Sequence, residues 1–345
     1  MAATPTPRPT ASLKSADVVP PAPNPCGPAL IRWFASGPPS VSNPIAVAYS
    51  AGADSTALLL AVHERWPDRV IALHVHHGLQ TAADDFESRG RAFCERLGIP
   101  FSSSRVHAAH EPGQSPEDAA RQKRYRALAS MAQDEGAACV LLGQHADDQA
   151  ETLMLALSRG AGLPGLAAMA ERFERHGVVF GRPLLGLPSK VLREWLLTHG
   201  HDFVDDPTNA DHRYTRNRIR ALLLPAWEAC FPGFRPMLAR SARHAAQAQT
   251  LLDDLACIDM AQTGAPPAIL MLQALSRERQ ANVLRHWLHQ IAGAAASTAQ
   301  LDELLDQVAD CTTRGHRIHL KVASGFVARE GGRLVFLQPG NTPPI

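Results

Sequence analysis

A chain of 345 residues is long enough to form two domains with substantial hydrophobic cores. Its 45% hydrophobic and 19% charged residues are those of an ordinary soluble protein. The formal net charge of +1 excludes a chain-wide electrostatic attraction to nucleic acid, so any RNA-binding basic surface must be local.

Neither the amino terminus nor the cysteines indicate export. Residues 1–27 are rich in Pro, Ala, Ser and Thr and lack the apolar core of a signal peptide, so we expect a disordered extension there. The six cysteines lie far apart without any C-x-x-C pair, which argues against a zinc site of that type and fits a reducing cytoplasm. No apolar run approaches the roughly 18–20 residues that a membrane span needs. We therefore predict a cytoplasmic protein with no membrane partner.

Strands and helices are predicted to alternate in the first half of the chain. Short β-rich apolar runs are separated by longer helical patterns, which is typical of a parallel sheet with helices on both faces. Ligands bind such sheets beyond the carboxyl ends of the strands, so the turns at 50–55, 76–80 and 143–148 should meet at one edge. The predicted strands are Ile45–Tyr49, Val70–His76, Phe101–Arg105 and Cys139–Leu142, and the helices are Thr56–Trp66, Ala82–Leu97, Pro116–Glu135 and Asp147–Leu157.

The second half is predicted to be mostly helical up to Gly264-Ala265-Pro266-Pro267, whose turn residues mark a domain boundary. After this boundary, two helical patterns and three short strand-like runs indicate a small α+β domain. The remaining predicted elements are loops at 163–165 and 182–188, helices Ser189–His199, Met237–Gln262, Arg277–Ile291 and Thr298–Ala309, and strands Arg317–Val322, Phe326–Arg329 and Leu334–Leu337.

The turn Ser50-Ala51-Gly52-Ala53-Asp54-Ser55 joins the first predicted strand to the first predicted helix. Small residues at such a junction leave backbone N–H groups available at the helix amino terminus, where they can bind phosphate. The turn matches neither the Walker P-loop nor the G-x-G-x-x-G pattern. It resembles the S-G-G-x-D-S motif of the PP-loop ATP pyrophosphatases, which split ATP into AMP and pyrophosphate. The resemblance implies that Ser50, Ala51, Gly52, Ala53, Asp54 and Ser55 bind ATP.

Ala51 departs from this motif, which has glycine at the same place. Alanine keeps the backbone N–H group. If the loop needs a positive φ at this position, alanine costs on the order of 1 kcal/mol relative to glycine. We still expect the loop to bind nucleotide.

Carboxylates stand at two of the predicted helix starts. Asp54 can cap its helix or hold Mg²⁺ against phosphate oxygens. Asp147 follows His145 at the start of another helix, where the helix dipole alone would favour an acidic residue. The functional alternative is that Asp147 helps Asp54 to hold Mg²⁺ on ATP, with Glu151 on the same helix face.

Two further motifs allow a structural and a functional interpretation. The run His74-Val75-His76-His77-Gly78-Leu79 contains the H-x-H pattern of some metal sites, but a structural or substrate-facing role is more common for such histidines. Arg121 and Arg124 lie one turn apart in the helix predicted over 116–135. They form either a solvated charged face or a pair that faces ATP phosphates or an RNA backbone.

The stretch from Arg213 to Arg243 is locally basic, with Glu228 as its single acidic residue. Such density suits contacts to a phosphate backbone, although arginines on a packed helix would give the same pattern. The arginines are Arg213, Arg216, Arg218, Arg220, Arg235, Arg240 and Arg243.

Taken in order, these segments resemble the tRNA(Ile)-lysidine synthase family over about residues 28–245. The resemblance includes the E-x-x-A-R-x-x-R-Y helix at 117–125 and the H-x-D-D-Q-x-E-T segment at 145–152. It continues through Arg159-Gly160-Ala161-Gly162, Arg182-Pro183-Leu184-Leu185, Asp205-Asp206-Pro207-Thr208-Asn209 and Arg216-Asn217-Arg218-Ile219-Arg220. Each segment alone is a weak to moderate match, whereas the ordered set is specific.

The resemblance implies an α/β fold: a parallel-sheet PP-loop (adenine nucleotide alpha hydrolase-like) domain, a helical segment and a small α+β domain. It implies a ligase that uses ATP and Mg²⁺ to join free L-lysine to C2 of the wobble cytidine of the CAU-anticodon isoleucine tRNA, so that the tRNA reads AUA codons. The expected parts are the extension 1–27, the catalytic domain 28–215, a helical tRNA-contact region 216–264 and the domain 265–345.

The resemblance leaves the oligomeric state open, and a homodimer is one of the possibilities. The proposed site residues fall into four groups. They are Asp54, Asp147 and Arg121 for catalysis, with the two aspartates holding Mg²⁺ through ATP; residues 50–55 for ATP; and Arg213, Arg216, Arg218 and Arg220 for RNA. Asp205, Asp206 and Asn209 either recognise the ammonium groups of lysine or cap a loop, and the sequence leaves both roles open.

Two alternatives remain at this stage. One is another PP-loop tRNA modifier such as a thiolase, which would need a catalytic cysteine pair; Cys94 and Cys139, in the core of the domain, lie in no matching motif. The other is a non-catalytic tRNA-binding protein whose loop Ala51 has inactivated.

Overall fold

The computed structural model describes residues 22–37, 43–76, 81–106, 116–205, 211–293, 295–313 and 315–338. They divide into two units, the first made of the chain up to Thr152 and of Met169–Ala239, the second of Leu153–Ala168 and the chain from Arg240 onwards. Among the described residues, no helix combines the length and apolar character required to cross a lipid bilayer.

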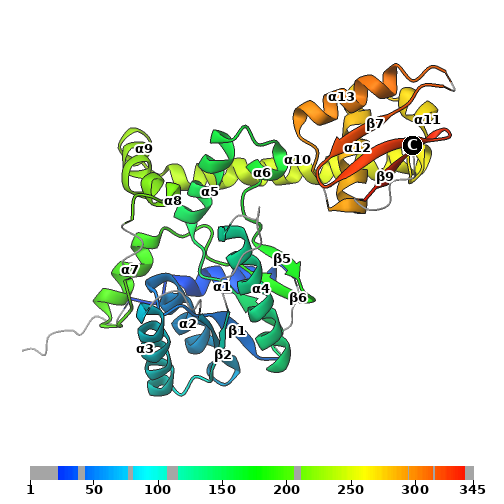
Figure 1. Cartoon of the computed structure of the whole chain (residues 1–345). Coiled ribbons are helices and arrows are strands. Elements are labelled where there is room, and N and C mark those ends of the chain that lie inside the picture. The colour runs from blue at the N-terminus through cyan, green and yellow to red at the C-terminus, as the bar shows by residue number, and fades with distance from the viewer. Residues whose placement is uncertain are drawn as a thin grey trace, which may run out of the picture. The chain divides into compact units, whose positions relative to one another are not determined.

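The first unit is built on a six-stranded sheet (Figure 1). The strand order is β3-β2-β1-β4-β6-β5, in which β5 is an antiparallel edge strand and the other neighbours pair in parallel. The strand order reverses between β1 and β4, since β2 and β3 lie on one side of β1 and the later strands lie on the other side. The carboxyl ends of the strands at such a switch point form a ligand crevice. The strands are β1 Ile45–Ala48, β2 Val70–His76, β3 Phe101–Arg105, β4 Cys139–Leu141, β5 Arg172–Arg175 and β6 Val178–Gly181.

Helices cover both faces of this sheet because its central strands are apolar on both sides. One core joins β1 to α1, α2, α3 and α7, and Leu58, Leu59 and Trp33 are among its buried side chains. The opposite core joins β2, β4 and β6 to α4 through Tyr125 and Leu128. The helices and helical turns of this unit are α1 Cys26–Ala35, α2 Ala53–Arg65, η1 Pro67–Arg69, α3 Thr81–Leu97, α4 Pro116–Asp134, the start of α5 Ala146–Ser158, α7 Ser189–Thr198, α8 Thr215–Arg218, η3 Ile219–Leu223 and α9 Leu224–Cys230.

The second unit has its own core, formed where an antiparallel sheet of order β7-β8-β9 packs on helices. Trp287, Leu284 and Leu304 are completely buried in it. A capping box between Ser297 and Gln300 starts α13. The elements are α6 Leu163–Leu166, most of α10 Phe234–Thr263, α11 Ile269–Gln273, α12 Arg277–Ala292, α13 Thr298–Ala309, β7 His319–Val322, β8 Gly325–Glu330 and β9 Arg333–Leu337.

The predicted fold class is confirmed, and several predicted boundaries need correction. The predicted strands Val70–His76 and Phe101–Arg105 match β2 and β3 residue for residue. The hairpin β5–β6 and the short helix α6 lie where we predicted only loops or no element. Residues 22–27, expected to belong to the disordered extension, are folded, because the Asn24 side chain is buried and donates to the Ala57 carbonyl oxygen at 3.1 Å. The compact units also divide at Ala239, inside the predicted region 216–264.

Candidate active site

The turn between β1 and α2 is ordered by its two serines. The Ser50 backbone N–H donates to Ser55 Oγ at 3.2 Å, and the Ser55 hydroxyl donates to the Gly52 carbonyl oxygen at 3.0 Å. Gly52 is the N-cap residue of α2, and the N–H groups of a first helical turn lack partners within their own helix. The turn therefore presents hydroxyl and backbone donors at a helix amino terminus, as a phosphate site requires.

Ala51 adopts the left-handed conformation that the sequence motif reserves for glycine. Its φ is 63°, and its side chain is 2% exposed. Its carbonyl oxygen accepts a hydrogen bond from the Val204 N–H at 2.9 Å, which joins the turn to the segment after α7. The loop thus keeps the backbone shape of a glycine loop, at a cost of about 1 kcal/mol for the methyl group.

A second glycine brings the turn after β4 against this loop. A Cβ atom placed on Gly143 would lie 3.1 Å from the Ser55 nitrogen, tighter than nearly all real contacts of this kind. Glycine therefore allows residues 143–148 to reach the start of α2, as expected for two turns at one edge of the sheet.

His145 lies at the centre of three carboxylates. Its Nε2 is 3.4 Å from an oxygen of Asp54 and 3.4 Å from an oxygen of Asp148, and its Nδ1 is 3.7 Å from Asp147. Burial would lower the pKa of His145, but the hydrogen bond to Asp54 and the charges of the three carboxylates raise it to about 9. The raised pKa favours the protonated imidazole, whose charge attracts all three carboxylates.

Asp54 stays ionised in spite of its partial burial. Burial raises its pKa, but the hydrogen bonds from His145 and from the Ser189 hydroxyl, the latter at 2.8 Å, more than offset this and lower it. Its carboxylate also lines the cavity described below. Asp54 thus presents a negative charge to any ligand there.

Asp147, the predicted second Mg²⁺ ligand, does not line the cavity, and both of its oxygens accept from protein groups. One accepts from the Ser189 N–H at 3.0 Å, and the other accepts from Arg235 Nε at 2.5 Å. Asp148 lines the cavity beside Asp54 instead, and its Oδ2 accepts from the His145 N–H at 3.0 Å.

Glu151 lies behind Asp148 and is completely buried. Its Oε1 accepts from Arg220 Nε at 2.8 Å, and its Oε2 has no hydrogen-bond partner among the described residues. Burial raises the pKa of Glu151, and the Arg220 charge opposes that rise. Arg220 also lies 3.5 Å from Asp148. Arg220, which we predicted to bind RNA, therefore contacts two carboxylates of the site.

The second arginine of the predicted pair, not the first, faces the site. Arg124 lines the cavity, and burial lowers its pKa from its ordinary value, whereas Arg121 is exposed and is not among the lining residues. Arg182 fixes this wall, since its Nη2 donates to the Tyr125 hydroxyl at 3.1 Å and its Nε to Gln144 Oε1 at 3.0 Å. Arg124 replaces Arg121 as the candidate phosphate-binding residue.

These groups surround a cavity of about 670 Å³, a volume within the usual range for small-molecule sites. Its lining combines polar groups, which include the loop, the carboxylates and Arg124, with apolar side chains that suit a nucleobase. The larger aliphatic and phenyl side chains are Leu73, Val75, Phe86, Leu128, Leu142 and Val204.

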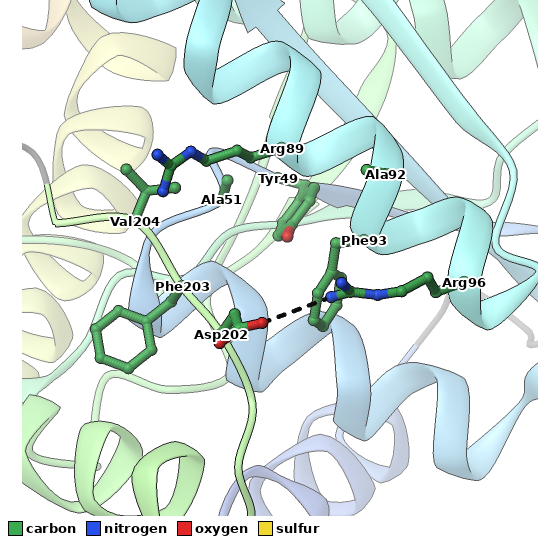
Figure 2. A pocket seen from close by; sticks show the side chains of 9 residues that line it. All are labelled: Tyr49, Ala51, Arg89, Ala92, Phe93, Arg96, Asp202, Phe203 and Val204. Atoms are coloured by element: carbon green, nitrogen blue, oxygen red, sulfur yellow. Dashed lines mark ion pairs between the residues drawn. The ribbon is translucent and has the colours of Figure 1, made fainter.

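A second cavity of about 360 Å³ lies beside the same loop (Figure 2). Arg89 and Arg96 extend from α3 toward the segment 202–204, and Arg96 forms a long ion pair of 3.9 Å with Asp202. Phe93 and Phe203 supply aromatic walls. The carboxylates near His145 do not line this cavity, so the chemistry of the site is assigned to the larger one.

The H-x-H histidines have separate partners. His74 Nδ1 contacts the Tyr49 carbonyl oxygen at 2.9 Å, and burial lowers its pKa, while His76 Nε2 is 3.1 Å from Asp84. Among the described residues, no group of three or more His, Cys, Asp or Glu side chains is arranged to hold a metal ion. Residues 77–79 of this motif lie outside the described part of the chain.

The predicted lysine-binding residues are only partly described. Asp205 lines the larger cavity and accepts from Arg193 at 2.6 Å, whereas Asp206 and Asn209 lie outside the described residues. Of the other predicted RNA-binding arginines, Arg213 is exposed and pairs with Asp211 at 2.7 Å. Arg218 donates to Thr215 Oγ1 at 3.0 Å, and Arg216 has a partner as well.

Two protein families match different parts of this chain. Residues 31–227 match the PP-loop domain family, and residues 268–335 match the TilS substrate binding domain. The chain is 61% identical over 313 residues to the tRNA(Ile)-lysidine synthase of Polaromonas naphthalenivorans, covering 91% of this chain and 95% of that protein. It is 47% identical to the protein of the same name from Burkholderia pseudomallei, covering 77% of this chain but only 56% of that relative.

Among solved structures, the U34-tRNA thiolase NcsA from Methanococcus maripaludis is similar, with a TM-score of 0.53 and 17% sequence identity. The match covers 64% of this chain and 77% of that one. At this identity the similarity concerns the fold alone.

Proposed function

The chain belongs to the tRNA(Ile)-lysidine synthase family, and we propose that it joins L-lysine to C2 of the wobble cytidine in the CAU-anticodon isoleucine tRNA, using ATP. The observation that carries the proposal is the meeting of a phosphate-binding loop, two carboxylates and Arg124 around one cavity. We place the reaction in the cytoplasm and class it as the formation of a carbon–nitrogen bond by a ligase.

The reaction proceeds in two steps. The C2 oxygen of the cytidine attacks the α-phosphorus of ATP, a P–O bond forms, and the bond to pyrophosphate breaks. An amine of lysine then attacks C2, the C2–O bond breaks, and AMP leaves with that oxygen. Adenylation is needed because an amide-like carbonyl oxygen is a poor leaving group, whereas AMP is a good one.

The loop and Arg124 suit the phosphates. Ser50, Gly52 and Ser55 would donate hydrogen bonds to the pyrophosphate part of ATP, and Arg124 would offset the charge that grows as pyrophosphate leaves. A partly buried cation is effective here because the surroundings screen its charge less than water does.

Mg²⁺ fits the donor set at the cavity. Asp54 and Asp148 both present carboxylate oxygens there, and Mg²⁺ is commonly held by one or two carboxylates together with substrate phosphates. When bound, the ion would neutralise phosphate charge. His145 would keep the two carboxylates in place through its positive charge.

The proposed recognition of lysine rests on Asp205 at the cavity, and that of tRNA rests on the locally basic stretch. Asp205 is the described member of the predicted lysine-binding group that lines the cavity, and its carboxylate could pair with an ammonium group of lysine. Arg213, Arg216 and Arg218 are proposed to contact the tRNA backbone, since they lie in the locally basic stretch of the chain. A thiolase mechanism is not favoured, because Cys94 and Cys139 are buried and neither lines the cavity.

The test is transfer of labelled lysine to tRNA. The full chain is incubated with labelled lysine, Mg-ATP and a CAU-anticodon isoleucine tRNA transcript, and the C34U transcript serves as the control. Label on the first transcript alone supports the proposal. Label on both transcripts contradicts the assigned target base, and label on neither contradicts the assigned reaction.

A further inference from the structure

A cysteine, a histidine and an aspartate lie side by side in the second unit, and none of the three lines either of the cavities described above. Cys257 and Asp253 are on α10, four residues apart and therefore on one helix face, and His286 faces them from α12. The Cys257 Sγ lies 3.8 Å from His286 Nε2, and the His286 Nδ1 lies 3.7 Å from Asp253 Oδ1. The imidazole thus has the thiol on one side and the carboxylate on the other.

This order of groups is the one that activates a nucleophile. The Asp253 carboxylate, which also accepts from Gln249 Nε2 at 2.9 Å, lies on the Nδ1 side of the ring, and Nε2 faces the sulfur. The reactive species of cysteine is the thiolate, and an imidazole within hydrogen-bond distance of the sulfur can accept the thiol proton. The Sγ–Nε2 and Nδ1–Oδ1 distances are longer than those of strong hydrogen bonds. Such distances can shorten when the thiol reacts.

The packing of α12 on α10 keeps the groups together. Asn282 Nδ2 donates to the Leu252 carbonyl oxygen at 2.7 Å, and Arg279 Nε donates to the buried Asp259 at 3.1 Å. Both contacts join the two helices close to the cluster. His286 is held at its position by the same helix, with a side chain that is only 15% exposed.

Solvent exposure together with a neighbouring imidazole distinguishes the Cys257 thiol from the other cysteines. Cys257 and Cys230 are exposed, whereas the remaining four cysteines are buried. Among the described contacts, only Cys257 of the two exposed cysteines has an imidazole within hydrogen-bond distance of its sulfur. As no set of three metal-ligating side chains is found among the described residues, a nucleophilic role suits this cluster better than a metal site.

We propose that Cys257 is a reactive thiol which exchanges with low-molecular-weight disulfides and so becomes a site of reversible modification. The Cys257 proton passes to His286, and the thiolate attacks one sulfur of the disulfide. A new S–S bond forms at Cys257 as the old one breaks, and the released thiolate takes the proton from His286. Cys257 is oxidised and one half of the disulfide is reduced, so the exchange needs no further oxidant.

The test compares two cysteines in one molecule. The reduced full chain is treated with oxidised glutathione at neutral pH, and the mixed disulfide at Cys257 and at Cys230 is followed by peptide mass spectrometry. We expect modification of Cys257 to be faster by on the order of tenfold, because an unassisted thiol is only a few per cent thiolate at pH 7. Iodoacetamide alkylation should give the same order, since it needs the same thiolate.

Two variants separate base assistance from simple exposure. His286→Gln, which keeps a polar helix-forming side chain, should bring the Cys257 rate down to that of Cys230, and Asp253→Asn should lower it partly. Cys230→Ser should leave the Cys257 rate unchanged. Equal rates at the two cysteines in the unaltered protein would overturn the proposal without any variant. A Cys257 rate that His286→Gln does not change would overturn it as well.

Discussion

Asp54 and Asp148 each place a carboxylate oxygen 3.4 Å from the same atom, Nε2 of His145. One residue comes from the start of α2 and the other from the start of α5, so two different strand–helix turns supply them. The cationic imidazole offsets the repulsion between two neighbouring carboxylates. A cavity edge with this much negative charge is suited to a divalent cation that bridges protein and phosphate oxygens.

Asp54→Asn should remove lysine transfer almost completely while the fold is retained. The amide can still accept from Ser189 but has no charge for Mg²⁺ or for His145, so we expect kcat/KM to fall by on the order of 100-fold or more. Labelled-lysine transfer and circular dichroism check this together. Transfer near the level of the unaltered protein, with an intact spectrum, would remove Asp54 from the mechanism.

Arg124→Gln and Arg121→Gln form a matched pair one helical turn apart. Arg124 lines the cavity and Arg121 is exposed. The first change should therefore reduce kcat/KM by on the order of 100-fold, and the second should alter it by less than about threefold. Steady-state kinetics with varied ATP distinguish them. Equal losses in the two variants would show that the cavity wall is assigned wrongly.

Ala51 can be tested for the left-handed conformation of its backbone. Ala51→Gly relieves strain but loses a buried methyl group and loosens the unfolded chain, so its free energy of unfolding should change by less than about 1 kcal/mol. Ala51→Val should destabilise by about 2 kcal/mol or more, because a β-branched residue resists a positive φ. Urea unfolding measures both. A tolerated valine would contradict the φ of 63°.

The stability of the ligand-free protein should fall as the pH rises from about 6.5 to about 9. Since the pKa of His145 is raised from 6.5 to about 9 in the folded protein, the folded state binds its proton more tightly than the unfolded state does. The stabilisation is complete below pH 6.5 and is lost as the pH passes 9, by up to about 3 kcal/mol. Urea unfolding across this range should be flattened by His145→Gln. An unchanged slope in that variant would locate the proton elsewhere.

Local patterns in the sequence were sufficient to predict the parallel strands β1 to β4 and the turn at residues 50–55. The β-rich apolar run at β2 ends before a glycine-containing turn, and the 50–55 turn has its chemistry within six adjacent positions. The hairpin β5–β6 could not be predicted in this way, because Arg172–Arg175 has no alternating apolar pattern and forms a strand by pairing with β6. Tertiary pairing decides such an edge strand.

Which of two neighbouring charged residues contributes to the site also depends on tertiary structure. Asp147 and Asp148 are adjacent, and only the positions of Ser189 and Arg235 show that Asp147 is occupied by protein groups. Arg121 and Arg124 differ in the same way, through the packing of α4 on the sheet. Sequence spacing identified both pairs but could not assign the functional member of either.

The most direct test of the account is Mg²⁺-dependent lysine transfer by Asp148→Asn and by Asp147→Asn. The proposed site predicts that Asp148→Asn raises the Mg²⁺ concentration needed for half-maximal transfer by on the order of tenfold or more and lowers the maximal rate. Asp147→Asn should lower thermal stability, because it weakens the contacts to Ser189 and Arg235, and leave the Mg²⁺ requirement unchanged. The reverse pattern, with a raised Mg²⁺ requirement in Asp147→Asn alone, would contradict the pairing of Asp54 with Asp148.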